Sequence, residues 1–109
     1  MWGGPPEIGP IDGTVVPSAT GGSLPFLPHA TLRVLKHIRN SYASEAWSRY
    51  GFVNAFNPLK KWYDTDVIAI DTGVTMLMAE NLRTGFVWNT FMKNPEAQRG
   101  LRRAGFKSL

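Results

Sequence analysis

The chain has no cysteine at all, so neither a disulfide framework nor a thiolate metal site is possible. Charge is also scarce, because Asp, Glu, Lys and Arg together make up 18% of the 109 residues, with a net charge of +4. A surface poor in charge is typical of a domain whose faces meet other protein. The longest apolar run, around positions 74–79, is far shorter than the ~20 residues of a membrane span. The sequence therefore predicts no membrane span.

The first 28 residues are rich in glycine and proline. The N-terminus has no cationic start followed by an apolar stretch, so we expect no signal peptide in this chain. A disordered leader is one interpretation of this composition, but the segment carries more apolar residues than a solvated tail would. These are Ile8, Ile11, Val15, Val16, Leu24, Phe26 and Leu27. We therefore predict an ordered loop region over 1–28 and a helical region over 29–109.

Apolar residues recur at helical spacing after Pro28, a residue that suits the first position of a helix. They are Leu32, Leu35, Ile38 and Tyr42. A short helical piece is expected over 44–49, followed by a brief strand over 52–56 that ends at the turn signal Asn57-Pro58.

The second half of the chain carries further helix signals. Asp71-Thr72-Gly73 predicts caps for a helix whose 74–79 stretch is apolar on every face, which indicates surrounding protein. Gly85 should break or kink this helix, which continues over 86–93. Asn94-Pro95-Glu96 opens a last helix, and Gly105 closes it. The predicted fold class is all-α, with four to five helices and long Gly/Pro-rich loops.

Five segments carry a family resemblance, and together they cover nearly the whole chain. They are GGPPEIGPIDGTVVP (3–17), GGSLPFLP (21–28), RYGFVNAFNP (49–58), DVIAIDTGVTMLMAENLRTGFVW (66–88) and FMKNPEAQRGLRRAGF (91–106). With these motifs the chain resembles the C-terminal part of the glucoamylase-like (glycoamylase) domain family, related to bacterial endo-β-1,2-glucanases and cyclic β-glucan-processing enzymes. Many relatives carry Gln-Gly-Pro where this chain has Thr72-Gly73-Val74.

The resemblance implies part of an (α/α)6 toroid and part of a glycoside hydrolase-like domain acting on bacterial β-glucan. Twelve helices of ~11 residues with connections of ~5 need on the order of 190 residues. We therefore expect a partial toroid and an incomplete catalytic domain. The implied partners are an oligo- or polysaccharide substrate and the missing N-terminal helices of the same domain. The implied location of the complete protein is periplasmic or secreted.

Glycoside cleavage usually requires two carboxylates at a defined separation. Asp71 lies at the start of a predicted helix, where pockets of such toroids occur. It is either a catalytic general base or sugar hydrogen-bond acceptor, or a plain N-cap. Glu80 is nine positions further on a helix, on roughly the opposite face, so the two cannot form a catalytic pair. We expect Glu80 to pair with Arg83.

The other candidates are predicted to bind substrate. Asp64 and Asp66 alternate on an extended stretch beside Trp62 and Tyr63, an arrangement that can hold sugar hydroxyls below an aromatic face. A solvated acidic loop is the alternative. Glu7 and Asp12 belong to the first matching motif, and the resemblance implies a position at the pocket rim.

No cofactor or metal is predicted. Asp64, Asp66 and Asp71 do not have the spacing of a calcium loop. His29 and His37 have no third ligand and are expected near the surface.

Two other functions remain open at this point. A basic nucleic-acid-binding protein would use the cationic C-terminal segment, but the aromatic residues there fall at core spacing, so we predict no nucleic-acid partner. A non-catalytic or truncated module would bind sugar or a partner domain without cleaving. Its apolar faces would then favour poor solubility or self-association.

Overall fold

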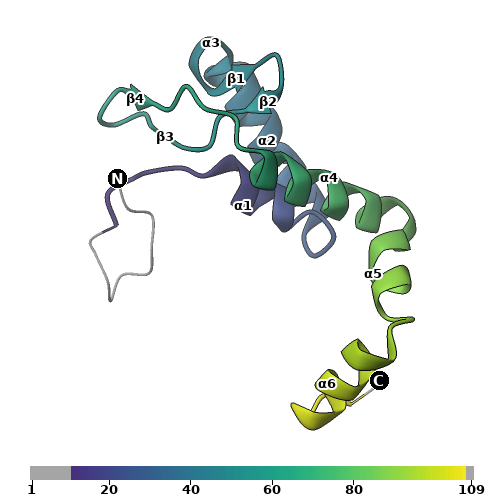
Figure 1. The fold of residues 1–109 in the computed structure, drawn as a ribbon. Helices are drawn as coiled ribbons and strands as arrows, with labels where there is room; N and C mark the ends of the chain where they lie inside the picture. The colour runs from purple at the N-terminus through teal and green to yellow at the C-terminus, as the bar shows by residue number, and fades with distance from the viewer. Residues whose placement is uncertain (1–10, 108–109) are drawn as a thin grey trace.

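The computed structural model describes residues 11–107, and these form a mostly helical structure with two minimal β-hairpins (Figure 1). The helices are α1 (Pro17–Gly22), α2 (Pro28–Ser41), α3 (Ala43–Ala46), α4 (Ala69–Thr84), α5 (Phe86–Phe91) and α6 (Pro95–Arg103). The strands are β1 (Trp47–Ser48), β2 (Gly51–Phe52), β3 (Phe56–Asn57) and β4 (Trp62–Tyr63). Strands β1 and β2 pair antiparallel, and so do β3 and β4.

The predicted helix after Pro28 is confirmed as α2. Its first turn is reinforced by Thr31, whose hydroxyl donates to the Leu27 carbonyl over 2.8 Å. Ile38 is buried and Tyr42 half-buried, as the spacing predicts, whereas Leu32 is exposed. The apolar stripe of α2 therefore reaches the core of this chain mainly at its C-terminal end.

Helix α1 corrects the prediction of a continuous loop over 1–28. Pro17 starts it at a position that tolerates the missing amide hydrogen, but the rest of PSATGG has poor helix propensity. Contacts with α4 compensate, because α1 lies against α4 (Figure 1). A Cβ atom at Gly21 would overlap with the Thr75 side chain, so only glycine allows this close approach.

The region 44–63 also differs from the prediction. The short helix ends at Ala46 rather than at 49, and the expected strand over 52–56 is split between β2 and β3. Gly51, with φ of 115°, closes the β1–β2 hairpin in a conformation that side chains disfavour. Aromatic and β-branched residues at 47–53 fit a pleated surface better than a helix, which explains why the helix stops early. The structure is mostly helical, as predicted, and this part adds two minimal hairpins to the one brief strand that was expected.

The break at Gly85 is confirmed, and the continuation ends at Phe91 rather than at 93. Gly85 adopts φ of 68° and ends α4. The buried Asn81 in α4 then caps the first turn of α5, since its Oδ1 accepts a hydrogen bond from the Trp88 amide over 3.0 Å. This bond fixes the direction in which α5 leaves α4.

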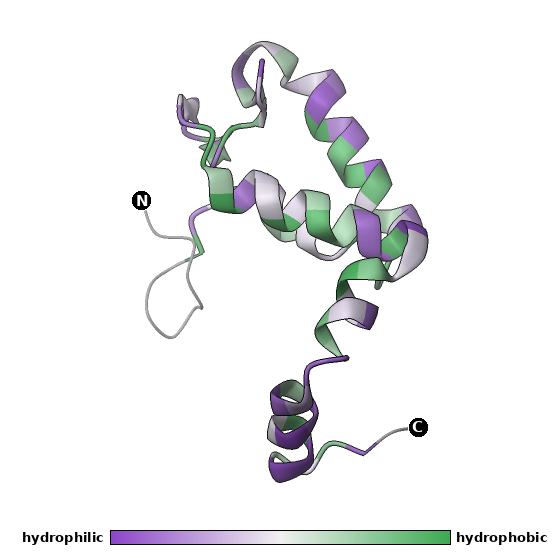
Figure 2. Ribbon diagram, turned by 45° about the vertical axis from the view of Figure 1, so that its right-hand side comes forward, coloured by the Kyte–Doolittle hydropathy of each residue, from purple (hydrophilic) through white to green (hydrophobic). Residues whose placement is uncertain are grey.

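The last helix is confirmed in its signals and bounds. The Asn94 side chain accepts a hydrogen bond from the Glu96 amide at the start of α6, and Gly105 follows its end with φ of 84°. Helix α6 extends away from the other helices and is predominantly hydrophilic (Figure 2).

The core of the described residues is small. Ile38, Ala46, Val53 and Phe56 are buried together. The radius of gyration is 16.5 Å, against about 13 Å for a compact domain of this length. The chain thus has a more open shape than a self-contained domain.

Candidate functional site

A pocket lies where the β1–β2 hairpin meets α1 and the first half of α4. Its volume is about 280 Å³, near the lower end of the ~300–1,000 Å³ typical of small-molecule sites. The hairpin and the residue after it supply Trp47, Tyr50, Gly51, Phe52 and Val53, and the helices supply Ser18, Asp71, Thr72, Thr75, Met76 and Ala79. Among these lining residues, Asp71 is the only acidic one.

Asp71 occupies the third position of α4 and is not the N-cap of this helix. The helix begins two residues earlier than predicted, at Ala69, with Ile68 as the N-cap and no capping hydrogen bond from a side chain. The interpretation of Asp71 as a plain N-cap was therefore wrong. Its carboxylate still lies in the first turn, where the positive end of the helix dipole favours a negative charge.

One oxygen of this carboxylate has no hydrogen-bond partner among residues 11–107. Asp71 Oδ2 is buried and accepts no hydrogen bond from any described residue. Most buried polar atoms in proteins are hydrogen-bonded, so an orphan carboxylate oxygen needs an explanation. An oxygen with an unused acceptor site in a pocket is able to accept a hydrogen bond from a ligand hydroxyl or a proton from a reacting water.

Helix α1 holds this region of α4 in place. Gly21 lies against Thr75, whose hydroxyl donates to the Asp71 carbonyl over 3.0 Å. Ser18, three residues before Gly21, then reaches the pocket wall. The close contact between α1 and α4 therefore also shapes the space around Asp71.

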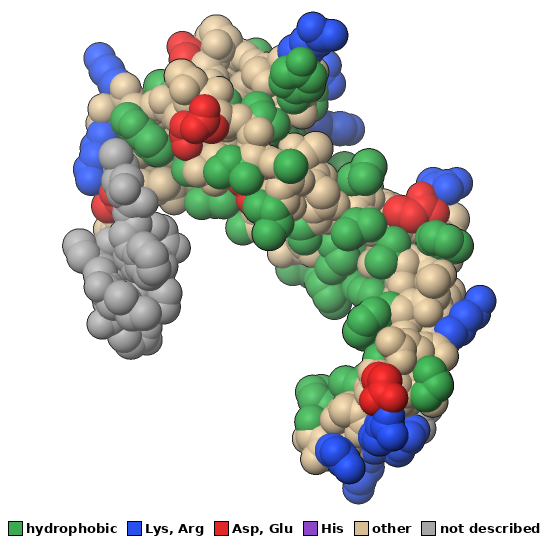
Figure 3. All heavy atoms as spheres, viewed as in Figure 1, with side chains coloured by type: hydrophobic (Ala, Val, Ile, Leu, Met, Phe, Trp, Pro, Cys, Tyr) green, Lys and Arg blue, Asp and Glu red, His purple; other side chains and the backbone are tan. Residues whose placement is uncertain are grey.

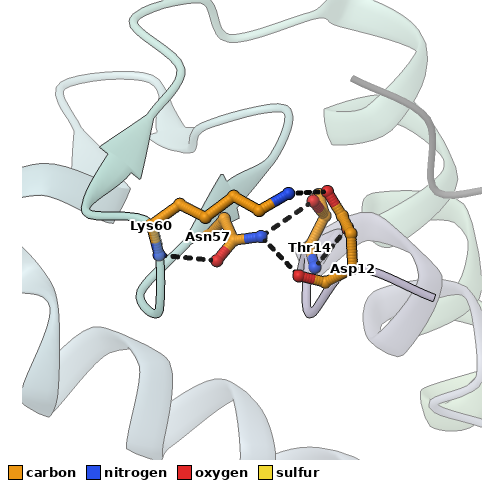
Figure 4. A network of polar contacts seen from close by, with 4 residues as sticks. All are labelled: Asp12, Thr14, Asn57 and Lys60. Atoms are coloured by element: carbon orange, nitrogen blue, oxygen red, sulfur yellow. Dashed lines mark hydrogen bonds and ion pairs between the residues drawn. The ribbon is translucent and has the colours of Figure 1, made fainter. Parts of the chain in front are cut away.

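Asp12 lies outside the pocket lining and belongs to a polar network (Figure 4). Lys60 Nζ lies 3.0 Å from Asp12 Oδ2, and the Thr14 amide donates to Oδ1 over 2.9 Å. The Thr14 side chain and Lys60 hydrogen-bond this carboxylate and lower the pKa of Asp12 to about 2. The fully buried Asn57 ties the network together: it donates to the Asp12 carbonyl and accepts from the Lys60 amide. This aspartate joins two loops.

The predicted cluster at 62–66 is divided by the structure. Asp64 accepts hydrogen bonds from the Asn54 side chain and from the Asp66 amide, both over 3.1 Å. These hydrogen bonds lower the pKa of the Asp64 carboxyl, with the bond from the Asp66 amide as the larger cause and the bond from Asn54 as the smaller one. Asp66 is exposed, and the Tyr63 ring stacks on Phe56 at 5.7 Å. None of these residues, nor Trp62, lines the pocket. Their role in sugar binding stays a prediction.

Other predicted residues have simpler outcomes. Glu7 lies outside the described residues. The Glu80–Arg83 pair is confirmed, with two hydrogen bonds of 2.9 and 3.0 Å. Both histidines are exposed, as expected. Within 11–107 there is no group of three potential ligands that could hold a metal ion, and no helix there is long and apolar enough to span a membrane.

The prediction missed the aromatic wall of the pocket. Trp47 and Tyr50 were not proposed as site residues, although Tyr50 and Phe52 lie in the matching motif RYGFVNAFNP. Three aromatic residues lie within the six positions 47–52, with a glycine at position 51. This pattern could have identified a hairpin with an aromatic face.

Comparison with known proteins agrees with the motifs. The model of the family "Glycoamylase", described as "Putative glucoamylase", matches residues 1–95. An exo β-1,2-glucooligosaccharide sophorohydrolase (non-reducing end) of Parabacteroides distasonis is 32% identical over 92 residues, which is 84% of this chain.

Two solved structures share the fold over most of this chain. One is a "putative glucoamylase" of Bacteroides uniformis, with a TM-score of 0.79 and 38% identity over 88% of this chain. The other is an endo-β-1,2-glucanase of Chitinophaga pinensis in complex with sophorotriose and glucose, with a TM-score of 0.79 and 35% identity over 89% of this chain. The chain spans 13% of the length of the sophorohydrolase and 23% of each solved chain.

Proposed function

The chain belongs to the glycoamylase family, and from this premise we propose that it forms part of a glycoside hydrolase domain that acts on β-1,2-linked glucan. The observation that carries the proposal is the buried, unpartnered oxygen of Asp71 in a pocket with an aromatic wall. The names of two similar proteins, a sophorohydrolase and an endo-β-1,2-glucanase, suggest the linkage. For the complete protein the proposal includes a periplasmic or secreted location, where polymeric glucan is accessible.

In this proposal Asp71 is the general base or the acceptor of a sugar hydroxyl next to the scissile bond. Hydrolysis with inversion or retention requires a second carboxylate. The pocket of the described residues contains only one, and Glu80 is committed to Arg83. In this proposal the second carboxylate lies outside the described lining of this pocket, either in residues beyond 11–107 or in another part of the domain.

The test is Asp71→Asn in the protein that carries this chain, with Glu45→Gln as a matched control on the exposed surface of α3. Removing a general base lowers kcat by about 10²- to 10⁴-fold. We expect a loss of this size on linear β-1,2-glucan, with no fall in the melting temperature because Asp71 Oδ2 has no hydrogen bond to lose among the described residues. The control should retain full turnover.

Undiminished turnover of Asp71→Asn would remove this residue from the site. A wild-type protein that binds β-1,2-glucooligosaccharides but releases no product would instead support the non-catalytic module. These outcomes are separated by measuring product release and binding on the same preparations.

We also propose that this chain supplies part of an (α/α)6 toroid and that other helices of the domain cover α4 and α5. Hydrophobic side chains gather along these two helices on the face seen in Figure 3. Met76 is 65% exposed, and Leu77, Phe86, Trp88 and Phe91 are also exposed. A soluble monomer rarely leaves so large an apolar surface open, and the solved relatives are about four times longer.

This proposal predicts that the 109-residue polypeptide alone associates with itself. Light scattering coupled to size exclusion should give a mass that rises with concentration. Replacing Met76 and Leu77 by Lys should reduce the association, whereas the same change at the exposed Asn89 and Thr90 should not. A wild-type monomer that melts cooperatively would contradict the proposed cover.

A further inference from the structure

The β1–β2 hairpin places two aromatic rings at the pocket without burying them in the core. Trp47 is 38% exposed and Tyr50 is 68% exposed, yet both line the pocket that contains Asp71. Tyr50 lies in the turn of the hairpin, and its amide donates to the Ser48 hydroxyl over 3.2 Å. Both rings are therefore accessible at the pocket and are not part of the hydrophobic core.

The Trp47 ring is fixed in orientation. Its centroid lies 4.6 Å from that of Phe52, with the rings at 87°, and the Arg39 guanidinium lies 4.9 Å from the Trp47 centroid. An edge-to-face pair and a cation over a ring are both favourable arrangements. Trp47 lines the pocket, whereas Arg39 does not. The Trp47 ring is thus held by two neighbours and still forms part of the pocket wall.

We propose that Trp47 and Tyr50 form a sugar-stacking subsite of the pocket. It binds one glucose unit of the glucan substrate, so that a hydroxyl group or the scissile bond of the substrate reaches Asp71. This inference rests on the proposed function and adds the residues that bind the substrate. In β-linked glucose the ring substituents are equatorial, so each face of the ring presents C–H groups. These carry partial positive charge and pack on the negative face of an aromatic ring. The hydroxyl groups point outward from the ring edge, where Asp71 is able to accept from one of them.

The pocket chemistry favours a neutral sugar over an anionic ligand. Its lining contains hydroxyl groups from Ser18, Thr72 and Thr75 but no lysine or arginine, and its one charge is the negative Asp71. A phosphate or carboxylate ligand would meet repulsion from Asp71, and the guanidinium groups of Arg39 and Arg49 lie over the Trp47 and Tyr50 rings rather than in the pocket lining. A neutral ligand with apolar faces and polar edges matches these walls.

The experiment measures equilibrium binding of β-1,2-glucooligosaccharides by calorimetry, together with hydrolysis, in the protein that carries this chain. The key variant is Tyr50→Ala, since an exposed turn residue can be truncated without disturbing the core. The matched control is Tyr50→Phe, which keeps the ring. An aromatic contact contributes about 0.5–1.5 kcal/mol, so we expect Tyr50→Ala to weaken binding about 2- to 12-fold. Tyr50→Phe should bind like the wild type.

Trp47 gives a second readout. Trp47→Leu should weaken binding more than Tyr50→Ala, because the ordered ring loses its whole stacking face, and Trp47→Phe should recover part of the loss. Raising the salt concentration should leave all these affinities unchanged, since no ion pair with the ligand is involved.

Unchanged affinity in Tyr50→Ala and Trp47→Leu, with both proteins folded by circular dichroism, would overturn the subsite. It would leave the proposed function intact if Asp71→Asn still abolished hydrolysis. The reverse pattern, with weaker binding in the aromatic variants but normal turnover in Asp71→Asn, would support the subsite and overturn the catalytic role of Asp71.

Discussion

Asp12 and Asp71 are both half-buried, yet they differ in the hydrogen-bond partners of their carboxylate oxygens. Asp12 has partners for both oxygens, from Lys60 and from Thr14, and its carbonyl accepts from Asn57. Asp71 Oδ2 is buried, has no hydrogen-bond partner in the described part of the chain, and belongs to a residue that lines the pocket. Asp12 therefore connects two loops, whereas Asp71 keeps one oxygen without a partner in the described residues.

The difference has a physical consequence. A buried polar atom without a hydrogen bond costs roughly 1–3 kcal/mol, and more when it is charged. An atom of this kind is more often found at functional sites than in purely structural positions. The Asp12 network stabilises the fold, whereas Asp71 Oδ2 contributes no hydrogen bond to it within the described residues. This contrast favours Asp71 over Asp12 as the residue that acts on a ligand.

The strongest way to sharpen the comparison is to break the network at Asn57. Asn57→Ala removes hydrogen bonds to the Asp12 carbonyl and the Thr14 hydroxyl, and it leaves the Lys60 amide without its acceptor. We expect the free energy of unfolding to fall by about 2–3 kcal/mol, the cost of leaving buried groups unpaired. Urea denaturation of the protein that carries this chain measures the change.

The control for this variant is Asn40→Ala on the exposed face of α2. It should alter stability by no more than about 0.5 kcal/mol, as is usual for surface positions. If both variants denature at the same urea concentration, the Asp12 network does not stabilise the fold and the contrast with Asp71 fails.

Much of the helical part could be predicted from sequence because its signals are local. Pro28, Leu35 and Ile38 lie within α2 and Tyr42 directly follows it, while Asn94 precedes α6 and Gly105 lies just beyond its end. The Glu80–Arg83 pair also needs only one helical turn. Such interactions depend on residues three or four positions apart, so a pattern is sufficient to predict them.

The missed features depend on contacts between distant segments. Helix α1 exists because Gly21 allows approach to Thr75, and the loops meet because Asn57 reaches Asp12, which is 45 positions away. The β1–β2 hairpin has a local signal, but no local pattern shows that its rings share a pocket with Asp71. Asp71 lines the pocket, and its catalytic role stays a prediction. Its N-cap alternative was wrong because Ala69 and Ile70 extend α4 at its start.

The smallest expected effect is on the pH dependence of stability at Asp12. Its pKa is about 2 in the folded protein, lowered from 3.8 by the Thr14 side-chain hydrogen bond and by Lys60. A group whose pKa falls on folding stabilises the protein above its unfolded pKa, and this contribution is lost as the pH falls through the folded pKa. The stability difference between wild type and Asp12→Asn should therefore be full above about pH 4, shrink between pH 4 and 2, and vanish below.

Urea midpoints at a series of pH values measure this difference, and repeating them at high salt tests its cause. Lys60 is 53% exposed at its side chain, so salt should screen the ionic part and reduce the difference, while the hydrogen bonds from Thr14 remain. In a Lys60→Met background the salt dependence should disappear. A difference that stays constant from pH 5 to 2, or grows on acidification, would mean that the Asp12 carboxylate is not held by this network. Asp12 would then be as available for a ligand as Asp71.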